Sequence, residues 1–152
     1  MSSVPSPNLP VTTPAEVFDA FEKNADEIYY IDVRTVAEFV SGHPRGRVIN
    51  VPIEFHHPHN DDRFANESFV LVIEDNCPKD ANIVIGDEAG ERAEKAAKTL
   101  IEHGYSNISV MLGGLKQWQL SALPVTGDNR EGVSYVSLLT PAKRKQKKKK
   151  TK

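Results

Sequence analysis

A short polar loop holds the side chains of this 152-residue chain that are best placed for chemistry. It follows the apolar run 83–85 and leads into an alanine-rich segment, and its residues are Asp87, Glu88, Ala89, Gly90, Glu91 and Arg92. A glycine-containing loop that enters a helix can direct several backbone N–H groups at one point, where the helix N-terminus adds partial positive charge. The loop can therefore cradle an anion. The plainer alternative is that Asp87 or Glu88 simply caps the helix.

The single cysteine, Cys77, is a second candidate nucleophile. It lies eight residues before Ile85, and eight residues of mostly extended chain span up to ~25 Å. We therefore expect Cys77 at the opposite edge of the sheet from the loop, as a packed or surface residue. One cysteine also excludes an intramolecular disulfide framework and a cysteine-rich zinc site.

Histidines and aspartates gather in the polar segment 54–68. They are His56, His57, His59, Asp61 and Asp62. Imidazoles are good zinc ligands, but no helical or strand period orders these residues and Pro58 interrupts them. We expect a solvated surface loop and no metal.

Alternating strands and helices are predicted to position these groups. Apolar or β-branched runs predict strands at 28–31, 48–51, 83–85 and 108–111. Helical spacing predicts helices over 14–23, near 36–40, up to His103 and around Trp118, whereas 69–73 fits either a strand or a buried helix. This alternation predicts an α/β fold whose mostly parallel sheet is covered on both faces. In such sheets, ligand sites lie at the C-terminal ends of the strands.

The ordered set of motifs from about 12 to 126 resembles the rhodanese-like (rhodanese homology) domain family. In the second half the matching residues are Gly90, Arg92, Ala96-Ala97, Leu100, Leu112-Gly113-Gly114, Trp118 and Leu123-Pro124. In the first half they are Asp32-Val33-Arg34-Thr35, Glu38-Phe39, Gly42-His43 and Gly46. The resemblance implies a three-layer α/β/α fold with a central, mostly parallel sheet of about five strands. It also implies that the 87–92 loop is the active-site loop.

Asp87 stands where the family carries its nucleophilic cysteine, and Ala93 stands where it carries a serine. A thiolate can accept a sulfane sulfur as a persulfide, whereas a carboxylate cannot, so we expect no catalytic residue here. The same cradle should keep Asp87 ionised, because hydrogen bonds to the charged form lower a carboxyl pKa. The loop would then be a pseudo-active site that Asp87 fills.

The sequence also predicts the roles of three further side chains. We expect Arg92 to form an ion pair with Asp87 or Glu88, and Arg34 to pair with Glu38 at i, i+4 spacing. His43 is expected to order a turn, as the resemblance implies.

Charge is distributed unevenly along the chain. Eight of the 19 basic residues lie in the last ten positions: Lys143, Arg144, Lys145, Lys147, Lys148, Lys149, Lys150 and Lys152. All 21 acidic residues lie in 1–142, which therefore carry a net charge of −10. We predict a flexible N-terminus (1–10), a rhodanese-like domain (11–126), a linker (127–142) and a disordered basic tail (143–152).

These observations favour a catalytically inactive rhodanese-like domain that acts as a binding or regulatory module, with no cofactor and an unknown protein partner. One alternative is a thiosulfate or thiol sulfurtransferase-type enzyme with unorthodox chemistry. Another is a nucleic-acid-associated protein that acts through its basic tail, which could also serve as an import signal, contact an anionic membrane surface, improve solubility or fold back on the acidic body. No apolar run approaches the roughly 20 residues of a membrane span, and the N-terminus lacks signal-peptide features. We expect an intracellular protein, cytoplasmic or nuclear.

Overall fold

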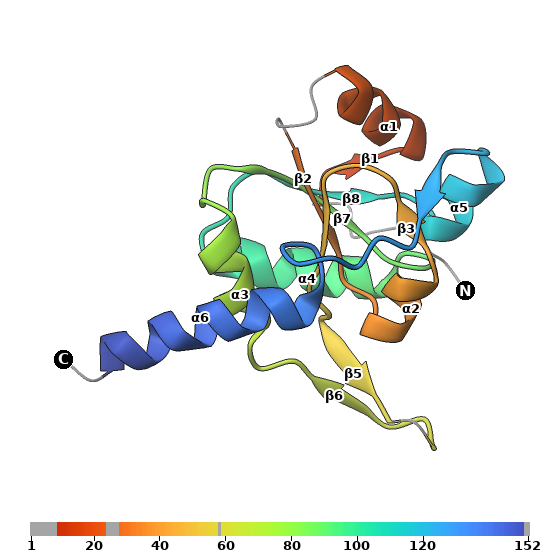
Figure 1. The fold of residues 1–152 in the computed structure, drawn as a ribbon. Helices are drawn as coiled ribbons and strands as arrows, with labels where there is room; N and C mark the ends of the chain where they lie inside the picture. Colours follow the sequence, from red (N-terminus) through yellow and green to blue (C-terminus); the bar gives the residue numbers. More distant parts are fainter. Residues whose placement is uncertain (1–8, 24–27, 58, 151–152) are drawn as a thin grey trace.

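A five-stranded parallel sheet forms the centre of the protein in a computed structural model, which describes residues 9–23, 28–57 and 59–150 (Figure 1). The strand order is β1-β8-β7-β2-β4. These strands are Val11–Thr12 (β1), Ile28–Asp32 (β2), Val48–Asn50 (β4), Asn82–Gly86 (β7) and Ile108–Met111 (β8). The predicted α/β fold with a mostly parallel sheet of about five strands is confirmed.

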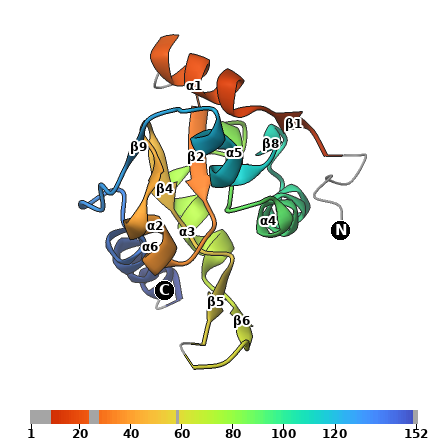
Figure 2. The same ribbon diagram turned by 90° about the vertical axis from the view of Figure 1, so that its right-hand side faces the viewer.

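Helices cover both faces of the sheet because successive strand residues point to opposite sides. Ile83 and Ile85 of β7 face a core shared with three helices: Phe69–Asn76 (α3), Glu91–Glu102 (α4) and Tyr135–Lys150 (α6). Val84, between them, faces a second core beneath Pro14–Lys23 (α1), Val36–Ser41 (α2) and Gly114–Leu120 (α5). Figure 2 shows α1 and α5 on one side of the sheet and α6 on the other.

Two small antiparallel pairs complete the fold. His43–Pro44 (β3) pairs with Val125–Thr126 (β9), and Glu54–His56 (β5) pairs with Arg63–Ala65 (β6). The second pair is a hairpin that projects below the sheet in Figure 1. Within the described residues, no helix is long and apolar enough to cross a membrane.

The structure resolves the ambiguous segment 69–73 in favour of a helix, α3. Phe69, Val72 and Ile73 are buried at i, i+3 and i+4, which is a helical face. The neighbouring polar segment, for which we expected a solvated loop, contains the β5–β6 hairpin.

Beyond the predicted domain boundary at residue 126, where we expected a linker and a disordered tail, residues 135–150 form a helix. Tyr135, Leu138 and Ala142 are buried against the α3 side of the sheet, and Leu139 packs beside them. This i, i+3, i+4, i+7 spacing is an amphipathic helical stripe, so the signal was present in the sequence but sparse. Of the predicted flexible N-terminus, residues 1–8 lie outside the described residues, while the Pro10 carbonyl accepts a hydrogen bond from Val110 of β8.

The packing of α6 gives a direct stability test. Leu138→Ala removes a side chain that is 6% exposed and should lower the free energy of unfolding by about 2–4 kcal/mol. Val136→Ala, on the same helix but 66% exposed, should change it by less than about 0.5 kcal/mol. Chemical denaturation of both variants measures the difference, and equal small effects would show that α6 is not part of the folded core.

Candidate functional site

The C-terminal ends of three neighbouring strands meet at one edge of the sheet. Asp32, the last residue of β2, is in register with Gly86 of β7 on one side and with Asn50 of β4 on the other. The 87–92 loop starts from this edge, as predicted from the topology of parallel sheets. The structure therefore brings the predicted loop together with the Asp32-Val33-Arg34 segment.

Asp87 points into the loop rather than into solvent. Asp87 is 2% exposed, and its Oδ2 accepts a hydrogen bond of 2.9 Å from the backbone N–H of Ala93. Helix α4 begins at Glu91, and its N-cap residue, Gly90, has no side chain to satisfy the first amides. The Asp87 side chain, three residues before Gly90, caps the helix instead, which is the plainer of the two roles considered for this carboxylate.

The second carboxylate oxygen of Asp87 is the unusual atom of the site. Oδ1 is buried and has no hydrogen-bond partner among the described residues. Burial raises the pKa of Asp87 above its ordinary value, while the Ala93 amide and the charge of Arg92 oppose that rise. The expectation that the cradle lowers this pKa is therefore wrong, because the backbone amides of Ala93, Gly90 and Arg92 do not offset the loss of water.

The Gly113-Gly114 pair allows α5 to pack closely against the loop. The backbone carbonyls of Asp87 and Glu88 accept hydrogen bonds from the amides of Leu115 (2.7 Å) and Lys116 (3.2 Å), at the start of α5. Gly114 has φ +58°, and a Cβ there would lie 2.5 Å from the Asp87 carbonyl oxygen. The glycine pair of the family-like motif thus permits the loop to pack directly on α5.

Gly86 has a similar steric role beneath the loop. A Cβ on Gly86 would collide with the hydroxyl of Tyr30, a residue that is 1% exposed. Tyr30 therefore fills the space under the strand ends. Burial and the neighbouring Asp32 carboxylate raise the pKa of this phenol well above its usual value.

Arg34 is held by the strand edge rather than by Glu38. Its guanidinium donates to both oxygens of Asp32, at 2.8–3.2 Å, and to the Gly42 carbonyl at 2.7 Å. A longer contact of 3.3 Å reaches Glu88 in the loop. The predicted Arg34–Glu38 pair is wrong, because Arg34 precedes α2 and its side chain turns back over β2.

Arg92 pairs with Glu38 instead of with Asp87 or Glu88. The guanidinium donates to Oε1 and Oε2 of Glu38 at 2.7 and 2.9 Å, which is a bidentate pair. Glu38 also closes the capping box of α2 with Thr35. Burial alone raises the pKa of Glu38, but the hydrogen bonds from Arg92 and Thr35 bring it down to about 2.

Cys77 lies at the far end of β7 from Asp87. It follows α3, five residues before β7 begins, and is 2% exposed within the core. Burial raises the pKa of its thiol to about 12, although the charge of Arg47 opposes the rise. The expectation of a packed cysteine away from the loop is confirmed.

The remaining histidines are structural or exposed. His43 stacks on Phe39 with ring centroids 3.7 Å apart, and its ring nitrogens contact the carbonyls of Pro44 and Asp128. It orders the β3 turn, as expected. His56, His57 and His59 lie at the β5–β6 hairpin, and among the described residues no group of three or more His, Cys, Asp or Glu is placed to hold a metal ion.

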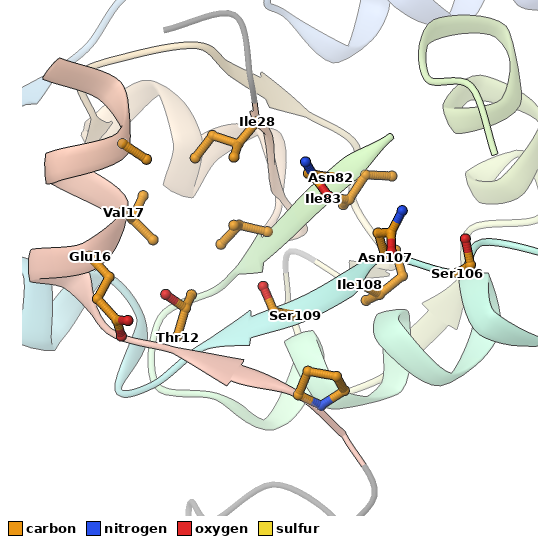
Figure 3. Close-up of a pocket in the computed structure, with 13 residues that line it drawn as sticks. Thr12, Glu16, Val17, Ile28, Asn82, Ile83, Ser106, Asn107, Ile108 and Ser109 are labelled. Carbon is orange, nitrogen blue, oxygen red and sulfur yellow. The ribbon is translucent and has the colours of Figure 1, made fainter. Parts of the chain in front are cut away.

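A cavity of about 410 Å³ lies at the other end of the strands (Figure 3). Asn82 and Ile108, the first residues of β7 and β8, line it together with Val17 of α1. In Figure 3 the side chains of Thr12 and Ser109 also border this space. The cavity therefore does not include the 87–92 loop.

Comparison with known proteins places this arrangement in context. A family model described as "Rhodanese-like domain" matches residues 13–121. The senescence-associated protein DIN1 of Raphanus sativus is 35% identical over 96 residues, which is 63% of this chain and 51% of that protein. Thiosulfate sulfurtransferase 16, chloroplastic, of Arabidopsis thaliana is 32% identical over 95 residues, which is 62% of this chain and 77% of that protein. This chain thus covers about half of the first of these relatives.

Solved structures agree with the fold. The solution structure of the rhodanese-like domain from the Anabaena sp. Alr3790 protein superposes with a TM-score of 0.64 at 21% identity. The superposition covers 78% of this chain and 80% of that one.

The raised pKa of Asp87 predicts a specific pH dependence. A carboxyl whose folded pKa lies above its unfolded value, ~3.9, stabilises the fold below that value and loses this contribution as pH rises through the folded pKa. Asp87→Asn keeps an acceptor for the Ala93 amide but cannot ionise. The free energy of unfolding of Asp87→Asn minus that of wild type should therefore be larger at pH 7 than at pH 4, as measured by urea unfolding. A more favourable value at pH 4 would contradict the raised pKa.

Glu38 should show the opposite sign. Its pKa of about 2 lies below the unfolded value of ~4.3, so its contribution is present above that value and lost as pH falls toward 2. Glu38→Gln should destabilise the protein more at pH 7 than at pH 3. Thermal melts at the two pH values test this, with Glu102→Gln on the exposed end of α4 as the control.

Proposed function

Since this chain belongs to the rhodanese-like domain family, we propose that it is a non-catalytic member that acts as a binding or regulatory module. In this proposal Asp87 occupies the position of the family's nucleophilic cysteine. The observation that carries it is the Asp87 carboxylate itself, 2% exposed and bonded to the Ala93 amide inside the loop. The anion site is filled by a side chain of the protein.

The chemistry of sulfur transfer supports this proposal. Transfer of a sulfane sulfur requires a thiolate that attacks the donor and holds the sulfur as a persulfide. A carboxylate oxygen cannot form that intermediate. Cys77 does not replace it, because its thiol is buried at the other end of β7 and has a raised pKa.

The charges around the loop also oppose the binding of a small anion such as thiosulfate. Arg34 and Arg92, the two arginines beside the loop, are each paired with a carboxylate. Beside Asp87 the loop presents Glu88, whose side chain is 36% exposed, and the exposed Glu91. An anionic substrate would therefore meet carboxylates rather than free cations.

The same rim defines the kind of partner the loop fits. The half-exposed Glu88 and the exposed Ala89 and Glu91 form an acidic rim on the loop, whose backbone carbonyls are held by α5. We expect a protein that contacts this rim to present basic side chains. The alternative of an enzyme with unorthodox chemistry has less support. The name thiosulfate sulfurtransferase belongs to a relative and describes that relative only. The loop of this chain contains no cysteine that could supply the required thiolate.

A sulfur-transfer assay tests the proposal. With thiosulfate as donor and cyanide as acceptor, the wild-type protein should show no turnover above a protein-free control, and mass spectrometry should detect no added sulfur atom. Asp87→Cys should acquire a detectable persulfide, because the Ala93 amide and the α4 N-terminus then face a thiolate. Cys77→Ser is the matched control and should behave as wild type. Wild-type turnover that survives Cys77→Ser would refute the non-catalytic assignment.

A further inference from the structure

Helix α6 lies outside the matched family region, which ends at residue 121. Its first half is an integral part of the domain through Tyr135, Leu138 and Ala142. Its second half continues past this contact, and Figure 1 shows the last turns extending beyond α3, away from the sheet. The basic residues are therefore presented on a helix that is fixed at its base.

The described cations of this second half are distributed widely around the helix. Lys143, Arg144, Lys145, Lys147 and Lys148 are all exposed. At 100° per residue, these positions cover about 200° of the circumference. Ala142 and Lys145 mark the side toward α3, because Ala142 is buried there and Lys145 Nζ lies 2.7 Å from Asp75 Oδ1. Lys148 borders a cavity on that side together with Glu74 and Asp75 of α3, whereas Lys143, Arg144 and Lys147 point to the sides and outward.

Most of this charge is not neutralised by the body. Lys145 forms an ion pair with Asp75, and Lys148 also has an interaction partner. Within the described part of the chain, Lys143, Arg144 and Lys147 have no acidic partner. Cations at a helix C-terminus also interact favourably with the helix dipole, so the helical form of this segment is compatible with its charge.

We propose that the end of α6 binds duplex DNA by lying in the major groove and contacting phosphates with its lysines and Arg144. A helix with side chains is about 10–12 Å wide, which matches the ≈ 12 Å width of that groove. Cations spread around the helix reach phosphates on both walls of the groove. The net charge of −10 on residues 1–142 keeps the rest of the protein away from the polyanion, so the contact is confined to α6.

The composition of the segment disfavours a membrane surface. An interfacial helix carries Trp, Phe or Leu on one face and basic residues on the other. Residues 143–148 contain no apolar or aromatic residue, so no apolar face accompanies their cations. The only non-basic residue among them, Gln146, is polar, which fits a phosphate contact without an apolar anchor.

The test measures binding of the full chain to a mixed-sequence duplex DNA between about 50 and 200 mM salt, where backbone contacts depend strongly on ionic strength. The test variant replaces four cations with glutamine: K143Q, R144Q, K147Q and K148Q. Each lost phosphate contact makes the slope of log K against log salt less negative by about 0.9. The salt dependence of the variant should therefore be weaker, by up to about 3.6 in slope. The affinity at the lowest salt should fall at least tenfold.

The matched control changes the net charge equally but elsewhere on the surface: K23Q, K98Q, K116Q and R130Q. It should bind duplex DNA as wild type does. Gln146→Pro keeps every charge but interrupts the helix, so it should weaken binding to duplex DNA and leave binding to single-stranded DNA unchanged. Duplex RNA, whose major groove is deep and narrow, should bind more weakly than duplex DNA.

Several results would overturn the proposal. One is equal loss of affinity in the two quadruple variants, which would indicate a general charge effect. Another is a Gln146→Pro variant that binds duplex DNA as wild type does, because the helix would then be irrelevant. A third is equal or tighter binding to vesicles that contain phosphatidylserine, which would assign the segment to a membrane surface instead.

Discussion

The contact between the Asp87 carboxylate and the N-terminus of α4 determines how the strand ends are arranged. A buried carboxylate is costly unless hydrogen bonds and nearby cations compensate for the lost water, and here the α4 amides and Arg92 do so only in part. The backbone of the loop is held by α5, whose amides bind the Asp87 and Glu88 carbonyls, and Gly114 allows the close approach. The loop is therefore held both by α5, at its carbonyls, and by the start of α4, at the Asp87 side chain.

The arginines extend this support to the first half of the chain. Arg92 joins the start of α4 to Glu38 in α2, and Arg34 joins the end of β2 to Glu88, so each contact spans 54 residues of sequence. Glu38 serves two elements at once, because it also completes the α2 capping box. Both guanidiniums therefore link elements from the two halves of the chain.

Local patterns in the sequence predicted much of the fold, whereas contacts between distant residues were beyond them. The apolar run 83–85 and the capping residues at Thr13 and Thr35 predicted elements that the structure contains. The partner of Arg92 depends on where α2 packs, which no spacing reveals. The pKa of Asp87 depends on how many amides actually reach it. Helix α6 was missed because its apolar stripe is short, contains Pro141 and runs into the lysine-rich segment.

The pairing of β1 with β8 has a consequence for the synthesis of this protein. Val11 lies opposite Val110, and Thr12 lies opposite Met111, so β1 can join the sheet only after β8, about 100 residues later in the chain, has been synthesised. At about 5–20 residues per second, β1 waits roughly 5–20 s for its neighbour. During that interval the edge of the nascent chain is open to chaperones, and the two-residue length of β1 limits what can wrongly pair with it.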